Sequence, residues 1–126
     1  MQDAEAVERI SAVPVDAGPR LLSESEFRLR AFETVGGRAE AEVNNALFVV
    51  VRDDGSRLFP SFLLDRVLKR RQLVALVKRL EGVDDLAKWL FFVSPKASLC
   101  GLTPLEALRQ GKYRQVKVAA EGFAQR

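Results

Sequence analysis

Histidine is absent from this 126-residue sequence, and Cys100 is its only cysteine. Without histidine the chain lacks the commonest general base, and a single thiol leaves no nitrogen or sulfur cluster able to hold zinc. A lone cysteine also cannot close a disulfide within the chain. We therefore expect no metal, no cofactor and no enzymatic activity, in a protein that resides in the reducing cytoplasm.

Long apolar stretches are missing as well. No run approaches the roughly 20 residues needed to cross a bilayer, and Met1 to Arg9 is acidic, unlike a secretory leader. The chain is 48% hydrophobic, which suffices for one well-buried core, and it is too short for two ordinary domains. These features predict a soluble single domain over residues 21–126, with no membrane partner.

Charge is unevenly distributed along the chain. Residues 1–42 carry 9 acids and 5 bases, a net charge of −4, whereas residues 43–126 carry 8 acids and 15 bases, a net charge of +7. A basic second half suits an acidic partner surface or nucleic acid. A solvated helical face explains the same excess and is the commoner case, so both interpretations stay open.

The first part of the chain predicts an arm followed by two helices. Residues 1–20 mix charges, prolines and glycine with little periodicity, which indicates a flexible arm. Ser23 and Glu26 have the spacing of a capping box and predict a helix over residues 23–34. A glycine pair then breaks it, and residues 38–47 predict a second, short helix, so this region resembles a degenerate helix-turn-helix.

A β-hairpin is predicted next. Two extended runs, 47–51 and 58–64, flank the turn sequence Asp53-Asp54-Gly55-Ser56. Pro60 lacks an amide hydrogen, so the returning strand is expected at a sheet edge or bent there. Together with the helices, this predicts a mainly α fold: a small helical domain with one β-hairpin, in which residues 23–64 form the helical pair plus hairpin.

Two amphipathic helices are predicted between residues 68 and 93. The helical apolar spacing occurs twice, in Leu73, Leu76, Val77 and Leu80 and again in Leu86, Trp89, Leu90 and Val93. Asp84 is placed to cap the second helix and Pro95 to stop it. We expect Trp89 to lie in the core and part of the aromatic surface of Phe91 and Phe92 to form a contact patch.

The sharpest local signal is Thr103-Pro104-Leu105-Glu106. Threonine caps a helix, proline occupies its first position and glutamate returns to the cap amide. Gly111 ends this short helix, and a last helix turns a set of residues inward: Tyr113, Val116, Ala120 and Phe123.

A basic cluster begins the first of these C-terminal helices, with members Arg66, Lys69, Arg70 and Arg71. Such a cluster can contact phosphates, although it is more often a solvated helix face. The two N-terminal helices and the hairpin are long enough for a winged helix, but Glu40 and Glu42 on the second helix would repel DNA. A DNA-binding regulator is therefore the alternative function.

A spaced set of residues carries a family resemblance: Trp89-Leu90, Ser94-Pro95, Leu99, Gly101, Thr103 to Leu108, Gly111, Tyr113 and Val116, with Leu58-Phe59-Pro60-Ser61-Phe62 upstream. This block, about Ala46 to Phe123, resembles the toxin-binding domain of MbcA/ParS/Xre-type antitoxins. The resemblance implies a type II antitoxin whose residues 65–126 dock on a RES-type toxin, an enzyme that destroys NAD. The antitoxin shields the active-site entrance and need not catalyse.

The resemblance also implies partners and contact residues. The chain is expected to form a homodimer within a larger hetero-oligomer with its toxin. Family members usually bind operator DNA through an N-terminal helix-turn-helix, whereas this region is short and acidic. The capped helix and the terminal helix are expected to form the outermost element, and five of their residues to contact the toxin: Arg109, Lys112, Tyr113, Arg114 and Lys117.

Overall fold

The computed structural model describes residues 18–125, and the structural statements below concern those residues. The fold is mainly α with a small antiparallel sheet, which confirms the predicted fold class. In chain order the elements are β2 (Leu21–Ser23), α2 (Glu24–Val35), η2 (Gly36–Arg38), α3 (Ala39–Asn44), β3 (Val50–Val51), β4 (Arg57–Pro60), η3 (Ser61–Leu64), α4 (Arg70–Arg79), α5 (Asp85–Val93), η4 (Ala97–Leu99), α6 (Pro104–Arg109) and α7 (Tyr113–Ala124), with η denoting a 3-10 helix.

The predicted hairpin is confirmed as β3 and β4, but its strands are shorter than the predicted runs 47–51 and 58–64, because Ser61–Leu64 form η3 instead of extended chain. Val50 pairs with Leu58 across the hairpin, and Gly55 supplies the turn at φ +87°. The sheet has a third strand, β2, which the sequence did not reveal and which lies on the other side of β4. Leu22 of β2 pairs with Phe59, but three residues are too few to show an alternating pattern.

The sequence predicts Pro60 either in an edge strand or at a bend, and the structure distinguishes these two alternatives. The edge position is wrong because β4 is the central strand of the sheet. The bend is right because Pro60 is the last residue of β4, where the chain turns into η3. The next residue restores the pairing that proline lacks: the Ser61 amide donates to the Arg20 carbonyl at 2.8 Å.

Helices α2 and α3 form an N-terminal pair. The predicted capping box starts α2, because the Glu26 amide donates to Ser23 Oγ at 3.2 Å and the Ser23 amide donates to Glu26 Oε1 at 3.0 Å. The second helix is shorter than the predicted 38–47. It ends at Asn44, since the following segment leaves the helix to bring Phe48 into the core and lead into β3.

Helix α5 buries a different face from the predicted one. Phe91 and Phe92 are fully buried, whereas Leu86 and Leu90 remain 48% and 49% exposed and Trp89 is half-buried. The helix is apolar on most sides, so two faces compete for burial. The aromatic face wins because each phenylalanine removes more apolar area from water. The prediction that Phe91 and Phe92 form a contact patch is therefore wrong, and the large apolar side chains that α5 exposes are Leu86 and Leu90.

Helices α6 and α7 follow the predicted caps. Thr103 and Glu106 form the capping box of α6, and Pro104 occupies its first turn. Helix α6 is not an exposed element, because four of its six residues are buried: Pro104, Leu105, Ala107 and Leu108. Helix α7 packs on α4 and α6 through Val116 and Ala120, and its opposite side faces solvent.

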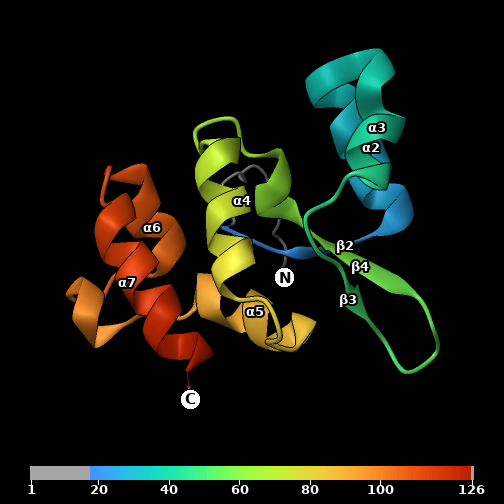
Figure 1. Ribbon diagram of the computed structural model, residues 1–126. Coiled ribbons are helices and arrows are strands. Elements are labelled where there is room, and N and C mark those ends of the chain that lie inside the picture. Colours follow the sequence, from blue (N-terminus) through green and yellow to red (C-terminus); the bar gives the residue numbers. More distant parts are fainter. Residues whose placement is uncertain (1–17, 126) are drawn as a thin grey trace, which may run out of the picture.

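One aromatic core joins the sheet to the C-terminal helices. Phe62 of η3 packs against Phe92 of α5 with ring centroids 4.9 Å apart, and Phe91 packs against Phe123 of α7 at 5.2 Å. Figure 1 shows the result: α2 and α3 stand at one end of the molecule, α6 and α7 at the other, with the sheet and α4 between them. Within residues 18–125 no helix has the length and apolar character of a membrane span.

Candidate functional site

The predicted toxin-binding residues meet at one corner of the molecule, which we call the α6–α7 corner (residues 109–117). Helix α6 ends at Arg109, and Gly111 turns the chain at φ +79°. The turn is fixed by two backbone bonds, from the Gly111 amide to the Leu108 carbonyl at 3.0 Å and from the Lys112 amide to the Ala107 carbonyl at 2.9 Å. Helix α7 then begins at Tyr113.

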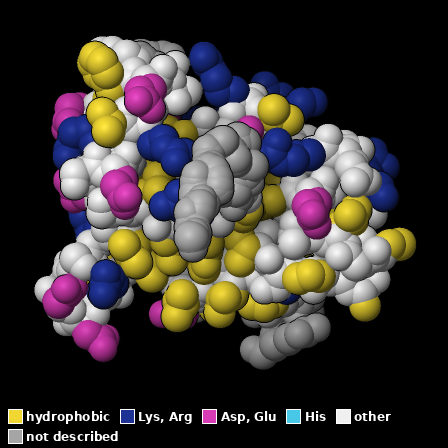
Figure 2. Space-filling view, turned by 180° about the vertical axis from the view of Figure 1, so that it is seen from behind, with side chains coloured by type: hydrophobic (Ala, Val, Ile, Leu, Met, Phe, Trp, Pro, Cys, Tyr) yellow, Lys and Arg dark blue, Asp and Glu magenta, His cyan; other side chains and the backbone are white. Residues whose placement is uncertain are grey.

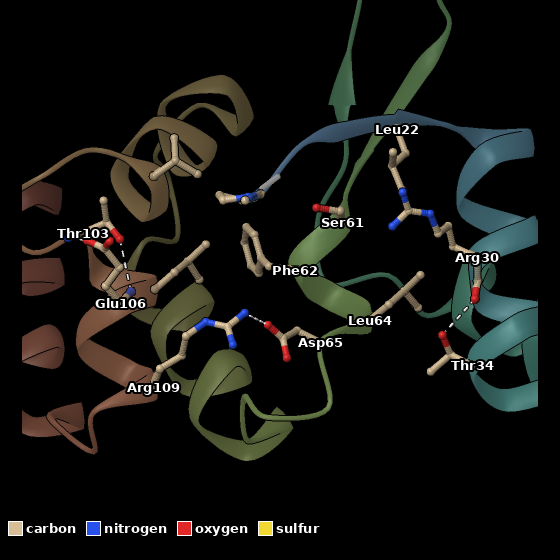
Figure 3. A pocket seen from close by; sticks show the side chains of 14 residues that line it. Leu22, Arg30, Thr34, Ser61, Phe62, Leu64, Asp65, Thr103, Glu106 and Arg109 are labelled. Atoms are coloured by element: carbon tan, nitrogen blue, oxygen red, sulfur yellow. Dashed lines mark hydrogen bonds and ion pairs between the residues drawn. The ribbon is translucent and has the colours of Figure 1, made fainter. Parts of the chain in front are cut away.

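The five residues do not share one environment. Arg114 is exposed, while Lys112, Tyr113 and Lys117 are half-buried at the start of α7. Arg109 is exposed as well, but its guanidinium is ion-paired with Asp65, which follows η3. Figure 3 shows this pair on the α6 side of a cavity. The Arg109 charge is therefore partly neutralised by Asp65, whereas Lys112, just before α7, and Arg114 and Lys117 on α7 contribute the other positive charges of the corner.

The solvent side of α7 contains two residues that sequence reasoning missed. We define the α7 outer face as Arg114, Lys117, Val118 and Gly122, residues one helical turn apart. Val118 is 66% exposed and follows Lys117 on the same side of the helix. A Cβ built on Gly122 meets nothing within 4 Å, so packing inside the described chain does not require glycine there.

Two contacts hold α7 in place without using its outer face. Arg79 of α4 donates through Nε to Glu121 at 3.0 Å, which pairs the only acid of α7. The Lys96 ammonium lies 5.0 Å from the ring centroids of both Phe91 and Phe123. Because Glu121 pairs with Arg79, the charged side chains of the outer face are cations. The contacts with Arg79 and Lys96 also fix the position of α7.

Two members of the basic cluster that would contact DNA in the alternative function instead make hydrogen bonds within the chain. Arg66 donates to the Thr34 carbonyl at 3.4 Å, near the end of α2, and Arg70 donates to the Asn45 carbonyl at 3.0 Å, just after α3. Carbonyls at helix ends lack partners within their own helix, and cations there are favourable. Lys69 and Arg71 are exposed, so two of the four cations face solvent without such a contact.

A cavity of about 630 Å³ separates the N-terminal pair from the C-terminal helices, and we call it the interhelix cavity. Five segments line it, and for that reason the sequence did not predict it. Its walls include Leu22, Arg30, Phe62, Val93, Leu105 and Arg109. Figure 3 shows Phe62 between Arg30 on the α2 side and Arg109 on the α6 side. The rear of the molecule likewise shows hydrophobic side chains flanked by Lys and Arg (Figure 2).

The resolved pKa shifts lie away from both features. Hydrogen bonds from Arg57 and Arg28 lower the pKa of Glu24, and the capping bonds of Ser23 lower the pKa of Glu26. Ser56 lowers the pKa of Asp54 in the hairpin turn. Residues 18–125 also contain no group of three or more side chains suited to a metal ion.

No family model, curated protein or solved structure matches this chain. The likeness to MbcA/ParS/Xre-type antitoxins therefore stays a prediction from the residues quoted above. The structure adds their local setting: Thr103 and Glu106 cap α6, and Gly111 turns the chain between α6 and α7.

Proposed function

We propose that this chain is the antitoxin of a type II toxin–antitoxin system, binding a RES-type, NAD-degrading toxin and covering its active-site entrance. The α7 outer face carries the proposal: Arg114 and Lys117 offer positive charge, and Val118 offers an exposed apolar side chain beside them. Such a face suits a partner surface with acidic groups around an apolar recess. The proposal includes a pair of these chains within a larger complex with the toxin.

Gly122 is the most specific support. Glycine inside a helix costs roughly 0.5–1 kcal/mol relative to alanine, and the described chain gains no packing from it. A glycine on an exposed helix face does let another backbone approach closely. The proposal accounts for this residue, because the toxin would contact α7 along Arg114, Val118 and Gly122.

The rigidity of the α6–α7 corner supports a role in covering the toxin rather than in catalysis. Helix α6 is capped at its start, buried along most of its length and joined to α7 by a tight turn. A surface that is ordered before binding loses little conformational entropy on binding. In the proposed mechanism α7 acts as a fixed cover over the toxin, and its residues contact protein rather than NAD.

The test uses a charge-reversed pair, Arg114→Glu with Lys117→Glu, and the product of an adjacent toxin-sized reading frame that is lethal when expressed alone. We expect the wild-type chain to rescue growth of cells that express the toxin and to bind purified toxin. The double variant should lose at least about 100-fold in affinity, as expected for two charges at an interface centre. Rescue and affinity equal to those of the wild type would refute this surface.

A matched control separates this proposal from the DNA-binding alternative. Lys69→Glu with Arg71→Glu makes the same charge change on exposed cations of α4. This pair should leave toxin binding unchanged. Salt-dependent retention of the toxin-free wild type on duplex DNA, abolished by the α4 pair, would favour a regulator instead.

A further inference from the structure

The interhelix cavity has an apolar interior with charge at its edge. Leu22, Phe62 and Leu105 are buried side chains that line it, and Leu64 and Val93 add half-buried apolar surface. A volume of about 630 Å³ lies within the range of roughly 300–1,000 Å³ common for ligand pockets. The cavity therefore has room for a few apolar side chains.

The charges around the cavity favour an acidic occupant. Its two carboxylates already have partners: Asp65 is ion-paired with Arg109, and Glu106 accepts from the Thr103 amide at 2.8 Å. Arg30 extends over the cavity from α2, as Figure 3 shows. An occupant with apolar side chains and carboxylates would bury the former and meet Arg30 with the latter.

The chain itself supplies such a segment. Gly18 and Pro19 line the cavity, so residues 1–17 are covalently attached at its edge. These 17 residues carry four acids and one base, a net charge of −3. Apolar residues recur at every third position, at Ala4, Val7, Ile10 and Val13. Fully extended, 17 residues reach at most about 56 Å, so length does not limit access to the cavity.

We propose that residues 1–17 dock in the interhelix cavity of their own chain, with apolar residues around Ile10 against Phe62 and acidic residues toward Arg30. Covalent attachment gives the segment a millimolar effective concentration, so modest contacts suffice to hold it. Any external peptide that used this cavity would first have to displace the segment. This inference does not depend on the identity of the toxin or on the α7 outer face.

Amide hydrogen exchange of the full chain tests the proposal, with a synthetic peptide of residues 1–17 as reference. Amides of residues 3–13 should exchange at least about tenfold more slowly in the chain than in the peptide. Arg30→Glu should remove most of this protection, and so should Ile10→Asp, which leaves residues 18–125 unchanged. Arg114→Glu reverses an equal charge outside the cavity and should have no effect.

Tryptic cleavage after Arg9, the only base in residues 1–17, provides a second readout. It should be slow in the wild type and faster in the Arg30 and Ile10 variants. Peptide-like exchange in the wild type would overturn the proposal. So would protection that neither variant reduces, because the segment would then dock elsewhere. Protection lost on about hundredfold dilution would place the segment on a second copy and overturn docking within one chain.

Discussion

Helices α2 and α6 begin with the same capping box and are each followed by a glycine at positive φ, yet they differ in how much of their surface is buried. Helix α6 buries four of its six residues between α5 and α7. Helix α2 buries Phe27 and Ala31 on one face but leaves Leu29 and Phe32 each 62% exposed on the other. Caps fix where a helix begins and ends, but its neighbours decide what it buries. We therefore expect α6 to depend on core packing and α2 on local contacts.

The largest expected effect comes from truncating the α6 core. Leu105→Ala removes a buried side chain and should lower the free energy of unfolding by about 2–5 kcal/mol. Phe32→Ser on α2 should change it by less than about 0.5 kcal/mol, because that ring is mostly in water. Urea unfolding of the two variants measures both values. Equal losses would remove the contrast between the helices.

Deleting either of the two cap hydroxyls should lower the free energy of unfolding by less than Leu105→Ala does. The part of the molecule that loses protection should differ between the two cap variants. Ser23→Ala and Thr103→Ala each remove one cap bond, worth about 1 kcal/mol. The α2 variant should raise amide exchange mainly within α2, whereas the α6 variant should lower the stability of the whole core. Amide hydrogen exchange measured residue by residue in the two variants tests this difference. Core-wide loosening by Ser23→Ala would contradict the local character of α2.

Acid should weaken the contacts of Glu24 and Glu26 that stabilise the start of α2. The pKa values of Glu24 and Glu26 are lowered below the ordinary 4.5 by partners in the folded chain. Their contribution to stability is thus complete above the unfolded-state pKa and is lost as pH falls through the lowered folded-state pKa. The protection factors of the α2 amides, which correct for the intrinsic pH dependence of exchange, should fall below about pH 4.5. Glu26→Gln keeps an acceptor for the Ser23 amide and should reduce this pH dependence.

Local chemistry explains what the sequence could predict. The caps at Ser23, Asp84 and Thr103 and the turn at Gly55 involve residues within four positions of each other, so their signals are complete in short windows. These signals located the helices and the hairpin. The inward side of α7 was also predicted, because its spacing leaves one apolar face: Val116 and Ala120 are buried.

Features set by distant segments were missed. Strand β2 exists because Leu21–Ser23 pair with β4, some 37 residues later in the chain at Leu22 and Phe59. The buried face of α5 was chosen by Phe62 and Phe48, which no window around residue 90 contains. The bonds of Arg66 and Arg70 to helix-end carbonyls and the interhelix cavity likewise need tertiary structure.

Gly122→Ala gives the most direct test of the α7 outer face as a docking surface. Alanine fits the free chain, so the variant should be more stable to urea by about 0.5–1 kcal/mol. The added methyl should prevent close approach of the toxin and weaken binding at least about tenfold, measured by calorimetric titration. A more stable chain that binds less tightly is the predicted result. Unchanged or tighter binding would contradict the account.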